Sequence, residues 1–484
     1  MMPEIPSLNW LVVSPHLAIA GGAIVLLLIA VSRYKRSYSL AAGTAVASLG
    51  LSCALALYGL GSTASSFAHM VTGDPFSTAF NLVFLLGAMI TVFLSANRLE
   101  QGYVLYADYF ALILLAVLGM MFLASGANLV MIFLGLETLS ISLYVLAGQR
   151  RDEPYSLESA LKYFLLGSFA SAFFLFGVAL MYGSLGSLDL AAIARAGGTD
   201  GLRSNALFAF GLLMLLIGFG FKIALVPFHM WTPDVYQGAP APVAGFMATG
   251  SKAAAFAALV RLLLGAVGQA YPHWPDILWI LAVLTMTVGN VVAIVQDNVK
   301  RMLAYSSIAH AGYVAVGVVA SNELSAPSVI FYLLAYTLMN LGAFGVLAAL
   351  AGPSGERQHI QHFAGLGYRR SFVGAAMALF MFSLAGIPPT AGFMAKFYVF
   401  SAALKSGYLW LVILGVLNSM ISVYYYLRVV VYLYMREPEQ KDAVAKPGWA
   451  VSLGLAVCAA GVVWFGVFPG SALDLLRQVS MALQ

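Results

Sequence analysis

The stretch FGFKIALVPFHMWTPDVYQGAPAP, residues 219–242, decides how this chain folds. It continues an apolar segment that is long enough to cross a membrane, yet it carries Lys222 followed by Pro227 and Pro233. Proline removes a backbone donor and clashes with the preceding helical turn. Within a bilayer the freed carbonyls need protein partners or a water-filled cavity. The stretch therefore predicts a broken membrane helix with a lysine beside the break.

A second stretch has the same character. FSLAGIPPTAGFMAKFYVF, residues 382–400, places Pro388 and Pro389 before Lys396. Discontinuous helices in corresponding positions of two halves point to the transport site of membrane carriers. One such break is explained equally well by an ordinary kink. Two breaks, each with a lysine nearby, favour a transport protein.

The composition agrees with a membrane protein. The chain has 484 residues, of which 62% are hydrophobic and 9% charged, whereas a soluble protein is about 25% charged. Apolar runs of membrane-spanning length recur from end to end. The net charge of +5 then reflects orientation in the membrane and not nucleic-acid binding. Cys53 and Cys458 form no CxxC spacing, so no metal or iron–sulfur site is expected.

We predict an all-α integral membrane protein of about fourteen helices, with boundaries uncertain by several residues. The predicted limits are 15–32, 39–60, 77–95, 108–125, 127–148, 157–183, 207–231, 242–266, 277–296, 300–320, 328–351, 371–403, 408–434 and 449–468. The first residues, MMPEIPSLNW, lack a basic region, so no cleaved signal peptide is expected.

The two breaks fall five spans apart, in helices 7 and 12. Helices 4–8 and 9–13 are therefore candidate five-helix repeats, and an odd number of spans inverts one relative to the other. The expected organisation is an N-terminal three-helix segment (1–107), a first repeat (108–266), a second repeat (277–434) and a C-terminal helix (435–484).

Lysine and arginine distribute unequally between alternate loops, and the richer side is normally cytoplasmic. This predicts cytoplasmic loops on the richer side and both termini outside. The richer set is Arg33, Lys35, Arg36, Arg98, Arg150, Arg151, Lys300, Arg301, Arg357, Arg369, Arg370, Arg436, Lys441 and Lys446. The opposite set is Arg195, Arg203, Lys405 and Arg477. Arg261 and Arg428 lie within spans and are expected to snorkel from helix ends.

Glu137 is the acidic residue that lies deepest in an apolar segment. A carboxylate at the bilayer centre costs roughly 2.5–3.5 kcal/mol on insertion scales, so it marks a candidate functional site. Lys162 lies on the next predicted helix, and an ion pair with Glu137 would lower the insertion cost of both. Alternatively, the Glu137–Lys162 pair is purely structural, or Lys162 extends to the cytoplasmic interface.

Further ionisable groups lie inside predicted spans. Lys222 and Lys252 fall near mid-membrane, whereas Lys396 is central only if the helix unwinds at its prolines. His229 follows Lys222 by seven residues, nearly on the same face if the helix persists, and His310 lies within SSIAHAGY, residues 306–313. Either histidine can titrate near neutral pH or serve as a satisfied packing residue. Together these groups predict a route for protons.

These residues resemble the antiporter-like membrane subunits of proton-pumping NADH:quinone oxidoreductase (respiratory complex I), a family shared with multisubunit cation/proton antiporters. That family pattern has a glutamate on helix 5 and lysines on helices 6, 7, 8 and 12. The matching residues are Glu137, Lys162, Lys222, Lys252 and Lys396. The resemblance covers essentially the whole chain and also implies inverted repeats and broken helices 7 and 12.

Within the family the resemblance is greatest to the N-type subunits. VYQGAPAP, residues 235–242, and NVKRMLAYSSIAHAGY, residues 298–313, fit that type. Lys396 argues against the M type, which typically carries a glutamate there. The chain ends soon after helix 14, without the long lateral extension of the L type.

The resemblance implies a mechanism. Quinone reduction elsewhere in the complex changes the state of Glu137 and Lys162, which alters the proton affinity of Lys222. Protons then pass through Lys252 and the region of His310 to Lys396. NAD, FMN, iron–sulfur clusters and quinone are expected in other subunits, and no redox chemistry in this chain. Expected partners are a neighbouring antiporter-like subunit, the small membrane subunits and the lipid bilayer of the bacterial inner membrane.

Two other interpretations stay open. The chain can belong to a cation/proton antiporter that works without redox input. It can also be a scaffold whose charges only hold helices together.

Overall fold

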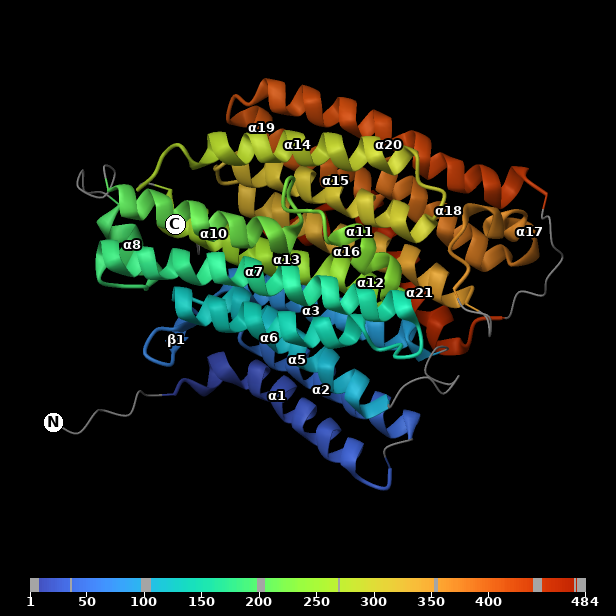
Figure 1. Ribbon diagram of the computed structural model, residues 1–484, viewed down its shortest axis with the longest axis horizontal. Coiled ribbons are helices and arrows are strands. Elements are labelled where there is room, and N and C mark those ends of the chain that lie inside the picture. The colour runs from blue at the N-terminus through green and yellow to red at the C-terminus, as the bar shows by residue number, and fades with distance from the viewer. Residues whose placement is uncertain are drawn as a thin grey trace.

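The computed structural model is a bundle of membrane-length helices (Figure 1). It describes residues 8–34, 37–96, 106–197, 205–268, 270–351, 356–437, 446–473 and 476. Lys35, Arg36, Arg98, Arg203, Lys441 and Arg477, which entered the charge comparison, lie outside the described residues. The helices α1 and α2 lie at one edge of the bundle, and α14 and α20 lie at the other.

The N-terminal part of the chain contributes five long helices and a small hairpin. Their bounds are α1 Trp10–Val31, α2 Tyr38–Tyr58, β1 Ala64–Ser66, β2 Val71–Gly73, α3 Pro75–Leu94, α5 Tyr106–Ser125 and α6 Leu129–Ala147. The antiparallel β1–β2 hairpin was not predicted. Side chains cap several of these helices: Asn9, Ser37 and Asn128 each accept a backbone N–H, and Asp74 forms a capping box with Ser77. Such caps satisfy donors that a helix start leaves free.

The middle of the chain contains the first break. The bounds are α7 Pro154–Leu185, α8 Leu190–Ala196, α10 Ala206–Ile223, α11 Thr232–Gly238, α12 Ala241–Phe246, α13 Lys252–Val260, α14 Trp274–Ile294 and α15 Val299–Val319. Two π-helical turns, Met247–Ser251 and Arg261–Val267, join α12 and α13 into one continuous span and extend it.

The remaining elements contain the second break. They are α16 Ser325–Ala349, a short 3₁₀ turn at Ile360–Phe363, α17 Leu366–Arg369, α18 Ser371–Ala385, α19 Ala391–Lys405, α20 Leu409–Met435 and α21 Trp449–Val467. Thirteen helices among the described residues are long and apolar enough to span a membrane, and α18 is a shorter apolar helix. With α18 and α19 taken together, every predicted span is present, and the all-α membrane class is confirmed.

Both predicted breaks occur, and they share one backbone design. Ala224 and Gly386 end α10 and α18 with positive φ, 62° and 85°. The next residues donate backward in the same way, Leu225 N–H to Gly220 O at 2.8 Å and Ile387 N–H to Phe382 O at 3.0 Å. This left-handed cap satisfies carbonyls that the helix end would leave bare.

Other local arrangements also occur twice, at one constant spacing along the chain. Asn128 and Asn298 cap α6 and α15 and form isolated bridges with Asp189 and His359. Gly119 of α5 lies against α6 as Gly289 of α14 lies against α15, each directly on backbone atoms of the neighbouring helix. The paired helices α5–α6 and α14–α15 therefore pack alike.

Candidate functional site

Lys222 sits on the last turn of α10, directly before the first break. Its side chain is buried, and Nζ donates to Ser140 Oγ at 2.8 Å and to Tyr163 OH at 3.1 Å. Nζ also lies 5.2 Å from the centre of the Tyr163 ring. The helices α6 and α7 supply these partners, so the lysine is held by neutral oxygens and an aromatic face.

Glu137 lies one turn before Ser140 on α6 and accepts a hydrogen bond from Ser171 of α7. Its carboxylate is near enough to Lys222 for their charges to interact. A small pocket with space for water runs between Ser171 and Lys222 and is also lined by Ser140 and Tyr144. Glu137 therefore acts on Lys222 across a partly polar gap.

The predicted Glu137–Lys162 pair is wrong. Lys162 Nζ lies 2.7 Å from Asp234 Oδ2 and 2.7 Å from Glu158 Oε1, and its side chain is 41% exposed. Ser171, which does reach Glu137, lies nine residues further along α7, or about 13 Å at 1.5 Å per residue. Lys162 is therefore at the wrong height to meet Glu137.

The first break satisfies its own backbone. Val226 N–H donates to Thr285 Oγ1 at 2.9 Å, and Trp231 Nε1–H donates to Phe221 O at 2.9 Å. These contacts supply the protein partners that a helix break needs inside a bilayer. The same break overturns the argument that placed His229 on the face of Lys222, because α10 ends at Ile223.

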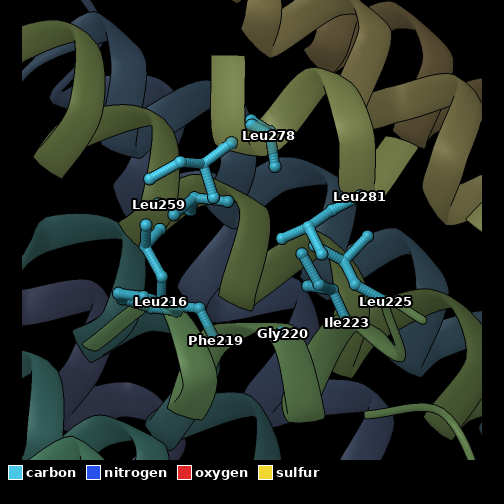
Figure 2. A pocket seen from close by; sticks show the side chains of 9 residues that line it. Leu216, Phe219, Gly220, Ile223, Leu225, Leu259, Leu278 and Leu281 are labelled. Atoms are coloured by element: carbon cyan, nitrogen blue, oxygen red, sulfur yellow. The ribbon is translucent and has the colours of Figure 1, made fainter. Parts of the chain in front are cut away.

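The opposite side of this break is apolar. Figure 2 shows a pocket to which α10, α13 and α14 contribute leucine side chains, among them Leu216, Leu259 and Leu281. Lys222 does not line it. The polar groups of the break are thus confined to the side that faces α6 and α7.

Lys252 and His310 continue the polar chain into the second half of the molecule. Lys252 Nζ donates to the carbonyl and hydroxyl oxygens of Ser307 at 2.6 and 2.5 Å. His310 Nδ1 lies 2.7 Å from Tyr332 OH and Nε2 lies 3.2 Å from Tyr426 OH. Ser307 and His310 both belong to α15, so this helix carries the chain onward.

Lys396 occupies the second break. Because α18 ends at Ala385 and α19 begins at Ala391, the condition that made Lys396 central is met. The side chain is 5% exposed. Nζ donates to Leu384 O at 3.1 Å, to Ala385 O at 3.0 Å and to Ser419 Oγ at 2.8 Å. The lysine therefore binds the carbonyls that the break frees.

A charged network that the sequence analysis missed lies where α6 ends and α7 begins. Asp234 of α11 binds Lys162 and also Arg301 Nη1, at 2.7 Å each. Lys300 binds Glu356 Oε2 at 2.6 Å, and both side chains are 1% exposed. Burial would raise the pKa of Glu356, but the Lys300 ammonium holds it below its usual range. Asp234 lies in the opening stretch of the analysis, beside Pro233, and that position was a usable signal.

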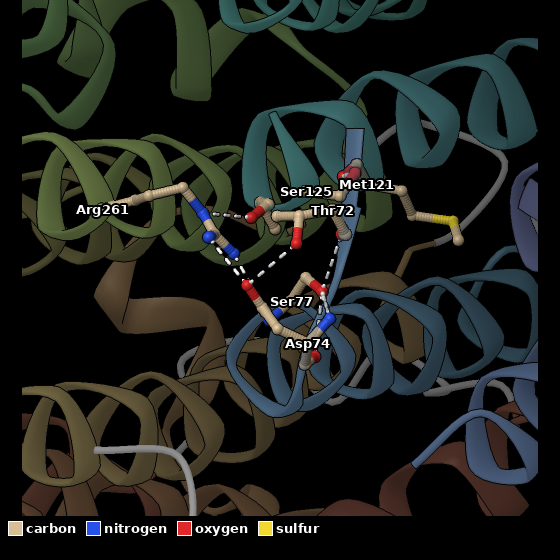
Figure 3. A network of polar contacts seen from close by, with 7 residues as sticks. Thr72, Asp74, Ser77, Met121, Ser125 and Arg261 are labelled. Atoms are coloured by element: carbon tan, nitrogen blue, oxygen red, sulfur yellow. Dashed lines mark hydrogen bonds and ion pairs between the residues drawn. The ribbon is translucent and has the colours of Figure 1, made fainter. Parts of the chain in front are cut away.

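Arg261 does not snorkel, contrary to the prediction. Figure 3 shows its guanidinium binding both carboxylate oxygens of Asp74, at 2.8 and 3.0 Å, and Nε donating to Ala124 O at 3.0 Å. Burial would raise the pKa of Asp74, but Arg261 holds it below its usual range. Arg428 instead reaches Asp297, which is largely exposed, as expected for a helix-end arginine.

Comparison with known proteins agrees with this geometry. Residues 126–422 match the family model described as NADH:quinone oxidoreductase/Mrp antiporter, transmembrane. The chain belongs to this NADH:quinone oxidoreductase/Mrp antiporter family. The expected antiporter-like family is thus confirmed.

Individual relatives narrow the similarity. The chain is 47% identical to NADH-quinone oxidoreductase subunit N of Trichlorobacter lovleyi, over 98% of this chain and 97% of the relative. It is 37% identical to a chain of respiratory complex I from Thermus thermophilus, with a TM-score of 0.82, covering 95% of this chain and 98% of that one. A chain of the Mrp complex from Dietzia is 20% identical and shares the fold, with a TM-score of 0.87 and 98% of each chain covered.

Proposed function

We propose that this chain serves as subunit N in the membrane arm of proton-pumping NADH:quinone oxidoreductase and translocates protons. The subunit N relatives over nearly its whole length support this assignment. The proton route would comprise Glu137, Lys162, Lys222, Lys252, His229, His310 and Lys396. Redox chemistry, with NAD, FMN, iron–sulfur clusters and quinone, would take place in other subunits.

One observation carries the proposal. Lys222, Lys252 and Lys396 are at most 5% exposed, and their hydrogen bonds within the described residues go to hydroxyl and carbonyl oxygens. A fixed ammonium without a carboxylate partner is expensive in a low-dielectric interior. A lysine that alternately holds and releases a proton is only transiently charged. Three such lysines in one membrane bundle suit a proton relay better than a scaffold.

The corrected contacts refine the order of events. Glu137 would act on Lys222 directly, through Ser171 and the intervening pocket. Lys162 would instead work with Asp234, at the end of the bundle where protons enter. From Lys222 the proton would pass by Lys252, Ser307 and His310 to Lys396. His229 would serve at the first break, near enough to Lys252 for a charge interaction.

The repeated packing of α5–α6 and α14–α15 and the two similar caps support two inverted five-helix repeats, 108–266 and 277–434, between the flanking segments 1–107 and 435–484. We propose a bacterial inner-membrane location with both termini outside. A neighbouring antiporter-like subunit and the small membrane subunits of the complex would be its partners.

The decisive test replaces Lys222 with methionine in the assembled complex. We expect NADH-driven proton pumping to fall by roughly a hundredfold, the lower range for loss of a proton-transferring side chain. Lys405→Met is the matched control, because Lys405 is 56% exposed and pairs with Glu323. Unchanged pumping in an assembled Lys222→Met complex would contradict the proposal. Co-purification of the unmodified chain with sodium/proton exchange but no NADH oxidation would favour the antiporter interpretation.

A further inference from the structure

A second polar pocket lies away from the lysine chain, where α1 and α3 begin and α2 ends. It has room for water-sized molecules. Its polar lining consists of His16, Ser62, Thr72, Ser77, Thr78 and Asn81. The proposed proton route uses none of these residues.

Two buried atoms of this lining have no hydrogen-bond partner among the described residues. They are His16 Nδ1 and Asn81 Oδ1. His16 is 4% exposed and Asn81 is 5% exposed. Buried polar atoms are nearly always satisfied by protein or by ordered water, and a roomy polar cavity with several partners is where buried water is found.

The hydrogen bonds of His16 determine what the pocket can take. Ser125 Oγ donates its hydrogen to Met121 O at 2.6 Å, so it accepts from His16 Nε2, 3.1 Å away. A neutral imidazole with its proton on Nε2 leaves a lone pair on Nδ1. Asn81 Oδ1 is also an acceptor. The occupant must therefore be a donor with at least two hydrogens, and water meets this requirement.

The nearby charges leave His16 as the proton acceptor. Asp74, which caps α3 beside the pocket, is already neutralised by both nitrogens of Arg261 and by Ser77 N–H (Figure 3). Hairpin His69 is engaged by Ser65. Of the described side chains that line the pocket, His16 is the one that changes charge near neutral pH.

We propose that this pocket binds water between His16 and Asn81 and that His16 accepts a proton from it. The pocket would form a hydrated, proton-accessible site separate from the lysine chain. Arg261 lies on the span that carries Lys252 and contacts Asp74 at the pocket wall. The site is therefore fixed mechanically to the lysine chain without sharing its hydrogen bonds.

The hydration is tested in a high-resolution cryo-electron microscopy map of the intact complex. We expect solvent density within hydrogen-bonding distance of both His16 Nδ1 and Asn81 Oδ1, and its loss in Asn81→Leu. His69→Gln, at the same end of the bundle, is the matched control and should retain the density. An empty pocket in the unmodified complex would overturn the proposal.

Proton uptake is tested independently of pumping, by solid-state nitrogen-15 NMR of histidine-labelled protein in lipid. The His16 signals are assigned by their absence in His16→Gln. We expect Nδ1 to shift reversibly from the unprotonated to the protonated position between about pH 8 and pH 5. An Nδ1 signal that stays constant across this range would overturn the assignment of His16 as acceptor.

Discussion

At the scale of single residues, the molecule treats buried charges in two ways. Arg261 with Asp74 and Lys300 with Glu356 are paired inside the protein. Lys222 and Lys396 are instead held by neutral oxygens. The paired charges tie segments together, whereas the unpaired lysines can change charge without breaking an ion pair. This division separates groups that stabilise from groups that work.

The buried Glu356 pair should be the more costly of two ion pairs to disrupt. Glu356→Gln leaves Lys300 charged and buried, and removing one partner of such a pair costs about 3–5 kcal/mol. We expect a clearly lower midpoint in thermal unfolding. Glu323→Gln is the control, because the Glu323–Lys405 pair is exposed and its loss should leave the midpoint unchanged. Equal midpoints in both variants would refute the distinction.

Glu356 also predicts a pH dependence. Its pKa is lowered in the folded protein, so its contribution to stability is complete above the pKa of an unfolded glutamate, about 4.3. That contribution is lost as the pH falls through the lower folded value. Acid unfolding followed by circular dichroism should therefore show a smaller loss of stability below about pH 4 in Glu356→Gln than in the unmodified protein.

At the scale of elements, the two helix breaks were predictable and their partners were not. Proline spacing located both breaks, and apolar length located every span. The partner of Lys162 was wrong because neighbouring spans alone do not fix relative height, and Asp234 comes from α11. The snorkelling of Arg261 was wrong because Asp74 lies far away in sequence. Hydroxyl partners such as Tyr163 give no pattern that sequence alone distinguishes from packing.

The crossing of α18 and α19 should depend on Gly392. A Cβ placed there would lie 1.8 Å from Ser383 O, a backbone atom. Gly392→Ala must push the two half-helices apart, at a cost of about 1–3 kcal/mol for overpacking, and shift Lys396 from its carbonyl partners. We expect a lower thermal midpoint together with reduced pumping. Gly50→Ala, where nothing lies within 4 Å, should be neutral or slightly stabilising. Normal pumping and stability in Gly392→Ala would contradict this account.

At the scale of the whole molecule, charge distribution and fold make a joint statement about orientation. Arg151 and Lys405 are both exposed and belong to opposite loop sets. The loop containing Arg151 joins α6 to α7, and Lys405 ends α19. The basic side should face the cytoplasm.

Labelling with a membrane-impermeant maleimide tests this orientation, after Cys53 and Cys458 are replaced. Arg151→Cys should react in inverted vesicles and Lys405→Cys in right-side-out vesicles. The reverse pattern would place both termini in the cytoplasm.

The partners of the two break lysines differ in a way that gives the chain a direction. Ser140 and Tyr163 at Lys222 are hydroxyls, which can turn around and either give or receive a hydrogen. Leu384 and Ala385 offer Lys396 only carbonyls, which can receive but never give. Lys222 thus stands at a two-way junction. Lys396 stands beside a one-way contact, so among its known partners only Ser419 can hand a hydrogen back to it. In circuit terms, the bundle places its switch at the first break and its rectifier at the second.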